Sequence, residues 1–379
     1  IQKEINRLYL IAGDYAIPNE LDKLLDEIGA TMVNAFTSEE VVAYFNVFPK
    51  SQIEKWLFLY AHRFQNPVFR LFQSELETVF EEKNMYADDF STNLIESFFK
   101  HFYKNHPYGQ QTVLGSIEHI KNPSLNNMRK MFDTYYVSNN MALMLIGNFD
   151  TEKVKPLIKT HYGIWKKGKV PAFPEYSEQK FNGREKVKAR QTPVKVGLMG
   201  FRTVPINHAD EIALNVATQL LSNSYSTGYL NKLSIDNKLM EVMAFNDTRI
   251  DHGGLMVLYV PKIFGQSFNK AEKLVHEQIL RLKEGDIDED FFNAVKLGMI
   301  KEYNESFEDL FTRTLLIAEL FYADRTWEDI INYPKKLSEV SIDDIKKVAE
   351  KYLNEDYLSY QSRMGFPKKE KLEKPGFDP

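Results

Sequence analysis

The stretch LFQSELETVFEEKNM, residues 71–85, has a pattern from which the rest of the chain can be interpreted. Its apolar residues recur three, four and seven positions apart, which predicts an amphipathic helix. At about 100° per residue, Glu75 and Glu82 lie on nearly one line within the apolar arc, whereas Glu77 and Glu81 lie on the far side. Carboxylates on an apolar face require a cation, a metal ion or a hydrogen-bond network. The alternative is a helix edge at which both glutamates reach solvent.

The composition limits the class of protein. The 379 residues suffice for two domains of ordinary size, and a hydrophobic fraction of 43% with 27% charged residues is typical of globular proteins. A net charge of −5 without a long basic block does not suggest a nucleic-acid partner. No apolar run reaches the roughly 18 residues of a membrane span. With no cysteine, disulfides and thiolate metal ligands are excluded, and both the cytoplasm and the bacterial periplasm or cell envelope stay open as locations.

Helical and strand patterns alternate along the chain, which predicts an α+β fold with helices packed on a mostly antiparallel sheet. Strands are expected at 31–36, 41–47, 142–146, 194–200, 255–260 and 357–361. The domains expected are residues 1–165, a Lys-, Pro- and Gly-rich linker at 166–192, a second domain at 193–365 and a charged tether at 366–379.

An internal repeat supports two copies of one unit. SLNNMRKMFDTYY at 124–136 resembles SIDDIKKVAEKYL at 341–353, and IEKWL…FQSELETVFEE at 53–82 resembles AEKLV…FNAVKLGMIKE at 271–302. Val295 stands opposite Glu75 and Glu302 opposite Glu82, so only the first copy keeps the carboxylate pair. The counterparts of the strand at 194–200 and of most of the helix at 208–221 are expected to precede Ile1.

Five segments taken together resemble the pitrilysin/insulysin (insulinase-like) family of zinc metallopeptidases, whose sister branch includes mitochondrial processing peptidase. They are ELDKLLDEIGATMVNAFTSEEVVAYFNVFP, the spacing Glu75-x₆-Glu82, HPYGQQTVLGSIEHI, YYVSNNMALMLIGNFD and VGLMGFRTVP. The resemblance covers nearly the whole chain in order. It implies two tandem units of the LuxS/MPP-like α/β fold, which form one half of a clamshell around peptide substrates.

The resemblance also implies roles for individual residues. Glu82 corresponds to the third zinc ligand, Glu75 to a supporting acidic neighbour, and Asn34, Ala35 and Phe36 to the edge strand that pairs with extended peptide. In this family a zinc-bound water attacks the scissile peptide bond. The partners implied are peptide substrates and a C-terminal half or partner subunit.

One departure from the family is large, because its His-x-x-Glu-His motif is absent. No two of the eight histidines are four residues apart. The nearest partial match to the motif is HADEI at 208–212, which is interpreted as chance. The sequence therefore predicts a fragment, truncated upstream of the motif, of a zinc endopeptidase that binds zinc when intact. On its own, the fragment is expected to hold no zinc and to be inactive. The alternatives are a non-catalytic partner or scaffold subunit of the same fold and a stand-alone peptide-binding module.

Overall fold

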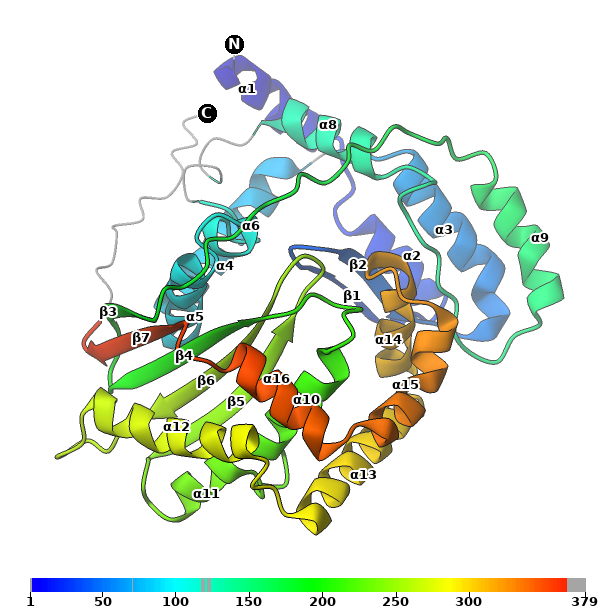
Figure 1. Ribbon diagram of the computed structural model, residues 1–379. Coiled ribbons are helices and arrows are strands. Elements are labelled where there is room, and N and C mark those ends of the chain that lie inside the picture. Colours follow the sequence, from blue (N-terminus) through cyan, green and yellow to red (C-terminus); the bar gives the residue numbers. More distant parts are fainter. Residues whose placement is uncertain (1, 70, 117–119, 121–123, 367–379) are drawn as a thin grey trace. The chain divides into compact units, whose positions relative to one another are not determined.

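The computed structural model describes residues 2–69, 71–116, 120 and 124–366, which fall into two compact units (Figure 1). Of the described residues, the first unit holds those up to 86 together with 112–175, and the second holds 87–111 together with 176–366. The repeat places residues 87–111 in the first domain, so the compact units and the predicted domains differ in this segment. The predicted domain boundaries therefore stay a prediction.

The first unit contains mainly helices and one hairpin. Its elements are α1 (Gln2–Gly13), α2 (Glu20–Glu27), β1 (Thr31–Thr37), β2 (Val42–Val47), the 3₁₀ turn η1 (Lys50–Gln52), α3 (Ile53–Gln65), α4 (Phe72–Asp88), α8 (Leu125–Tyr135) and α9 (Thr151–Tyr162). Its main core gathers the buried face of α3 with side chains from α2 and α9. Local signals set the helix ends: Ser124 and Asp150 cap α8 and α9 with their side chains, and Gly29 after α2 has a φ of 73°.

The strand expected at 142–146 does not form, and this prediction is wrong. In the second copy, the equivalent strand β7 (Tyr357–Met364) is held by hydrogen bonds to β4 (Val196–Thr203). The described part of the first unit has no strand equivalent to β4, because its sheet consists of β1 and β2 alone. Backbone groups without a neighbouring strand cannot form a ladder, so residues 141–146 stay extended without regular pairing.

The second unit is built on a five-stranded sheet in the order β3-β7-β4-β6-β5. Its strands β3 (Arg184–Thr192), β5 (Glu241–Thr248) and β6 (Gly253–Val260) join β4 and β7. All neighbouring pairs are antiparallel except β3 and β7, which run parallel. This sheet confirms the predicted α+β class with a mostly antiparallel sheet. However, β3 lies in the segment expected to be a linker, and the sequence predicts neither β3 nor β5.

Helices cover both faces of this sheet (Figure 1). One face packs against α10 (Glu211–Leu221), α11 (Tyr229–Ile235), α12 (Phe268–Glu284) and α16 (Ile342–Tyr352), and α13 (Glu289–Ser306) and α15 (Trp327–Glu339) add to the same core. The other face packs against α5 (Phe90–Phe102), which is followed by the short α6 (Pro107–Gln110). The remaining helix is α14 (Leu310–Tyr322). Segments more than 80 residues apart in sequence thus enclose one sheet.

Candidate functional site

The glutamate pair lies on α4, as the sequence predicts for residues 71–85. Among the α4 side chains that the structure describes, Leu76 and Phe80 are buried, and they pack with Ile120 in a small cluster of their own. Glu75 is exposed and Glu82 is half-buried. Among the described residues, neither side chain has a hydrogen-bond or ion-pair partner. The two carboxylates therefore flank the buried stripe and are available to a cation or to solvent.

The equivalent helix of the second copy, α13, presents a different face. Val295, opposite Glu75 in the repeat, is 9% exposed and belongs to the core that also contains α10. Glu302, opposite Glu82, is exposed and accepts a hydrogen bond from the Ser224 hydroxyl at 3.1 Å. A helix thus covers this face in the second unit, whereas α4 buries only its Leu76–Phe80 stripe among the described residues.

The predicted substrate strand is β1, and every residue in it is exposed. It pairs antiparallel with β2, and among the described residues no strand pairs with its other edge. Its register shifts between Thr31 and Asn34, where Met32 adopts a φ of 51°. The Ala35 N–H donates to the Asn34 side-chain oxygen at 2.8 Å, so this donor is occupied from within the strand. That β1 faces Glu82 stays a prediction.

The described residues do not fit a zinc ion. No group of three or more His, Asp or Glu side chains among them is arranged to hold a metal. Glu82 supplies one carboxylate, whereas a catalytic zinc site takes three protein ligands. In the partial motif match at 208–212, Glu211 forms an ion pair with Arg325, whose Nη2 lies 2.6 Å from Glu211 Oε1. His208 accepts the Asp210 N–H on Nδ1 at 3.0 Å.

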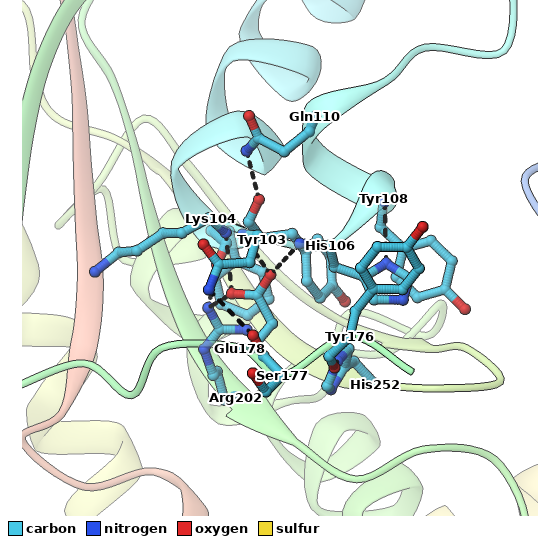
Figure 2. A network of polar contacts seen from close by, with 12 residues as sticks. Tyr103, Lys104, His106, Tyr108, Gln110, Tyr176, Ser177, Glu178, Arg202 and His252 are labelled. Carbon is cyan, nitrogen blue, oxygen red and sulfur yellow. Dashed lines mark hydrogen bonds and ion pairs between the residues drawn. The ribbon is translucent and has the colours of Figure 1, made fainter. Parts of the chain in front are cut away.

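A second polar centre lies in the second unit, around the turn Asn105–Gly109 (Figure 2). The Glu178 carboxylate accepts the backbone N–H groups of Lys104, Asn105 and His106 at 3.0, 2.8 and 2.5 Å. It also forms an ion pair with Arg202 at 2.8 Å, and the same guanidinium donates to the Phe102 carbonyl. One buried carboxylate thus satisfies the backbone donors that follow α5 and links them to β4.

His106 is fully buried and fixes the same turn from the other side. Its Nδ1 accepts the Tyr108 N–H at 3.1 Å, so the neutral ring carries its proton on Nε2. Nε2 lies 3.1 Å from Asp251 Oδ2, to which it donates. The Asp251 N–H in turn contacts the Tyr108 hydroxyl at 3.3 Å. These contacts join α6 to the turn between β5 and β6.

The electrostatics of this network match a structural role. Burial lowers the pKa of Arg202 despite the Glu178 charge beside it, and its guanidinium lies 5.0 Å from the centre of the Phe102 ring. Burial also raises the pKa of the Tyr103 phenol far above its ordinary value. Burial and the nearby His106 lower the pKa of His252, whose Nε2 lies 3.3 Å from the Tyr176 carbonyl. The turn is therefore held by contacts with the buried side chains of Glu178 and His106.

Sequence reasoning missed Glu178, Arg202 and Asp251. Glu178 lies in the segment expected to be a linker, and it meets the turn across more than 70 intervening residues. Neither spacing nor periodicity links positions so far apart, so the sequence held no signal for this cluster.

Among the described residues, no helix combines the length and apolar character needed to cross a bilayer.

The helix-covered, mostly antiparallel sheet defines an α+β protein, and its relatives are zinc proteases. Residues 123–299 match the family described as the peptidase M16 inactive domain. The chain is 23% identical over 346 residues to the zinc protease PqqE of Helicobacter pylori, covering 89% of this chain and 77% of that protein. It is 26% identical over 260 residues to the human mitochondrial-processing peptidase subunit beta, covering 66% of this chain and 49% of the subunit.

Solved structures show the same fold. A protease from Helicobacter pylori superposes with a TM-score of 0.81 at 22% identity, covering 91% of this chain and 84% of that one. The periplasmic protease PqqL from Escherichia coli gives 0.75 at 12% identity, covering 91% of this chain but 40% of PqqL. The chain is therefore homologous to zinc proteases of the M16 family, and the resemblance recognised in the sequence is confirmed.

Proposed function

We propose that this chain is part of a zinc-dependent metalloendopeptidase, to which α4 contributes Glu82 as a zinc ligand and Glu75 as a supporting carboxylate. The observation that carries the proposal is the unpartnered acidic pair on one helix face in a homologue of zinc proteases. A carboxylate pair without cation or donor is costly on a covered helix face and is common beside a metal. The contrast with the second copy, in which Val295 is buried at the position equivalent to Glu75, supports the proposal.

The same proposal assigns peptide binding to β1, through Asn34, Ala35 and Phe36. An unpaired strand edge can accept an extended peptide as an added strand, whose backbone groups supply affinity. Met32 and Phe36 of β1 are 56% and 38% exposed, and such apolar side chains suit contact with an unfolded peptide. The Asn34 side chain must release the Ala35 N–H before a substrate carbonyl can use it.

The remaining zinc ligands would come from outside the described residues. In the second unit α10 packs in one core with α13, and we infer that an equivalent helix bearing two histidines covers Glu75 and Glu82 in the active enzyme. Without that helix, this chain holds no catalytic zinc and cleaves no peptide.

The domain division at 1–165, 166–192, 193–365 and 366–379 is part of the same proposal. The part of the predicted tether from residue 367 onward lies outside the described residues.

A partner completes the proposed chamber. The match covers 40% of PqqL, and another solved structure that superposes with a TM-score of 0.73 is the first half of PqqL. We therefore propose that a C-terminal half or a separate subunit closes over this chain. A non-catalytic subunit is the second candidate, because the described residues hold no metal group and a chain of Complex III2 from Candida albicans superposes with a TM-score of 0.75.

The test compares this chain with the polypeptide encoded by the full reading frame that contains it. Zinc content and cleavage of a quenched fluorescent, unfolded peptide are measured for both. We expect neither zinc nor cleavage from the chain alone, and both from the full polypeptide. Glu82→Gln in the full polypeptide should abolish both, whereas Glu77→Gln, on the exposed face of α4, should leave both unchanged. A folded full polypeptide without zinc would favour the non-catalytic subunit.

A further inference from the structure

The edge strand β3 has an unusual distribution of charge. Arg184, Lys186, Lys188 and Arg190 occupy alternate positions and are all exposed, whereas Glu185, Val187 and Ala189 between them are half-buried. Side chains two residues apart on a strand share a face and lie about 6.7 Å apart. The four cations therefore form a row on one face, in a chain whose net charge is −5.

This row is electrostatically unbalanced. Arg184 is neutralised by Glu272 at 2.6 Å, but Lys186, Lys188 and Arg190 form no ion pair with a described residue, and Glu272 only partly offsets the repulsion at Lys186. Burial, followed by the charges of Arg184 and Lys188, lowers the pKa of Lys186. Arg363, the exposed residue near the end of β7, adds to this repulsion. An anionic partner would relieve the repulsion.

The backbone of β3 is open along the same row. β3 is the first strand of the sheet and pairs only with β7 among the described residues, so its other edge has no strand beside it (Figure 1). Basic side chains on an edge disfavour pairing with the same edge of a second copy, because like charges directly opposite each other destabilise a ladder. An acidic strand meets no such obstacle.

We propose that β3 is a docking edge for an acidic, extended segment of a partner polypeptide, which adds to the sheet as a sixth strand. Its carboxylates occupy alternate positions opposite Lys186, Lys188 and Arg190, and its backbone bonds to the free edge of β3. The regular alternation favours a peptide over a membrane or a nucleic acid. Those partners require positive charge, but they need neither an open strand edge nor a two-residue period.

The first test measures binding of a labelled eight-residue peptide of alternating threonine and glutamate by fluorescence anisotropy. Its isomer with four consecutive glutamates keeps the charge but loses the alternation, so it should bind about tenfold more weakly. Two further peptides of the alternating sequence carry N-methyl groups on all threonines or on all glutamates. Alternate N–H groups of a strand point to the same edge, so one methylated isomer should lose binding and the other should keep it.

The second test uses the protein. Lys186→Glu combined with Lys188→Glu should raise the dissociation constant of the alternating peptide about tenfold or more. The matched control, Lys262→Glu combined with Lys301→Glu, makes the same charge change at exposed positions outside β3 and should leave it unchanged. Equal binding of all four peptides, or equal loss in both double variants, overturns strand addition. Binding of phosphatidylglycerol vesicles or duplex DNA in place of the peptide also overturns it.

Discussion

Nη2 of Arg202 lies 2.8 Å from Oε2 of Glu178, and this ion pair fastens the segment before β3 to the middle strand of the sheet. The Glu178 side chain is 4% exposed and that of Arg202 is 19% exposed. Because the same carboxylate accepts three backbone N–H groups after α5, removing it leaves several donors and one charge without a partner.

Glu178→Ala should therefore lower the free energy of unfolding by about 3 to 5 kcal/mol, the range for breaking a buried ion pair from one side. Urea denaturation followed by circular dichroism measures the change. Glu175→Ala, three residues earlier and exposed, should stay within about 0.5 kcal/mol of the original protein. Similar losses in both variants would show that the segment, rather than the carboxylate, sets the stability.

His106 allows its two roles to be separated. His106→Ala removes both the cap on α6 and the bond to Asp251 and should cost about 2 to 4 kcal/mol in a fully buried position. His106→Asn keeps a side chain favoured at helix N-caps and should recover about 1 kcal/mol of that loss. Urea unfolding of both variants decides this. Equal losses would mean that the cap contributes nothing.

The sequence predicted the secondary-structure elements that depend on residues close together in the chain. Periodicity located α4, and the strand patterns located β1, β4 and β7. The strand at 142–146 was wrong because a strand also needs a partner. β3 escaped notice because its alternating charges, seen without β7 beside it, resemble a linker.

The candidate site also has features that the sequence predicted and features that it did not. The spacing of Glu75 and Glu82 on one helix could be read from the sequence, and so could the run Asn34–Phe36 on a strand. The sequence did not reveal that Glu75 is exposed and Glu82 half-buried, while Leu76 and Phe80 are buried among the described side chains of α4. Burial depends on which segments pack against the helix, and those contacts come from residues far along the chain.

Glu272 should make the second unit sensitive to acid. Burial alone would raise its pKa, but hydrogen bonds from Ser359, Tyr259 and Gln361 and the charge of Arg184 outweigh burial and lower the pKa below 4.5. A carboxyl with a lowered folded pKa contributes stability above its unfolded pKa and loses it as the pH falls through the folded value. Glu272→Gln should cost about 3 kcal/mol at pH 7. The difference in free energy of unfolding between the original protein and the Glu272→Gln variant should become smaller below pH 4.5. Urea unfolding at a series of pH values measures it, and a difference that stays constant with pH would contradict the prediction.

Two histidines should give a second pH dependence at higher pH. Burial lowers the pKa of both His252 and His276 below 6.5. The unfolded chain then binds more protons than the folded chain below pH 6.5, so stability should fall as the pH decreases, by at most about 1.4 kcal/mol per pH unit for each histidine. The double variant His252→Gln, His276→Gln should flatten this slope between about pH 6.5 and 5. His62→Gln, at an exposed position, should retain it.

The last prediction concerns two carboxylates that share Arg325. Its Nη2 lies 2.6 Å from Glu211 Oε1, its Nε lies 2.8 Å from Glu319 Oε2, and the other oxygen of Glu211 accepts the Asn207 N–H at 2.9 Å. Burial raises the pKa of Glu319, only partly opposed by Arg325, so its charged form lowers the stability of the folded state once the pH rises above its folded pKa.

Glu319→Gln should therefore leave stability at pH 7 unchanged or raise it by about 1 kcal/mol. Glu211→Gln weakens the closer ion pair and the contact to Asn207, so it should cost about 2 to 3 kcal/mol. Urea unfolding at pH 7 measures both. If Glu319→Gln destabilises as much as Glu211→Gln, the two carboxylates stabilise Arg325 equally, and the attraction of Glu319 to Arg325 outweighs the cost of burying its charge.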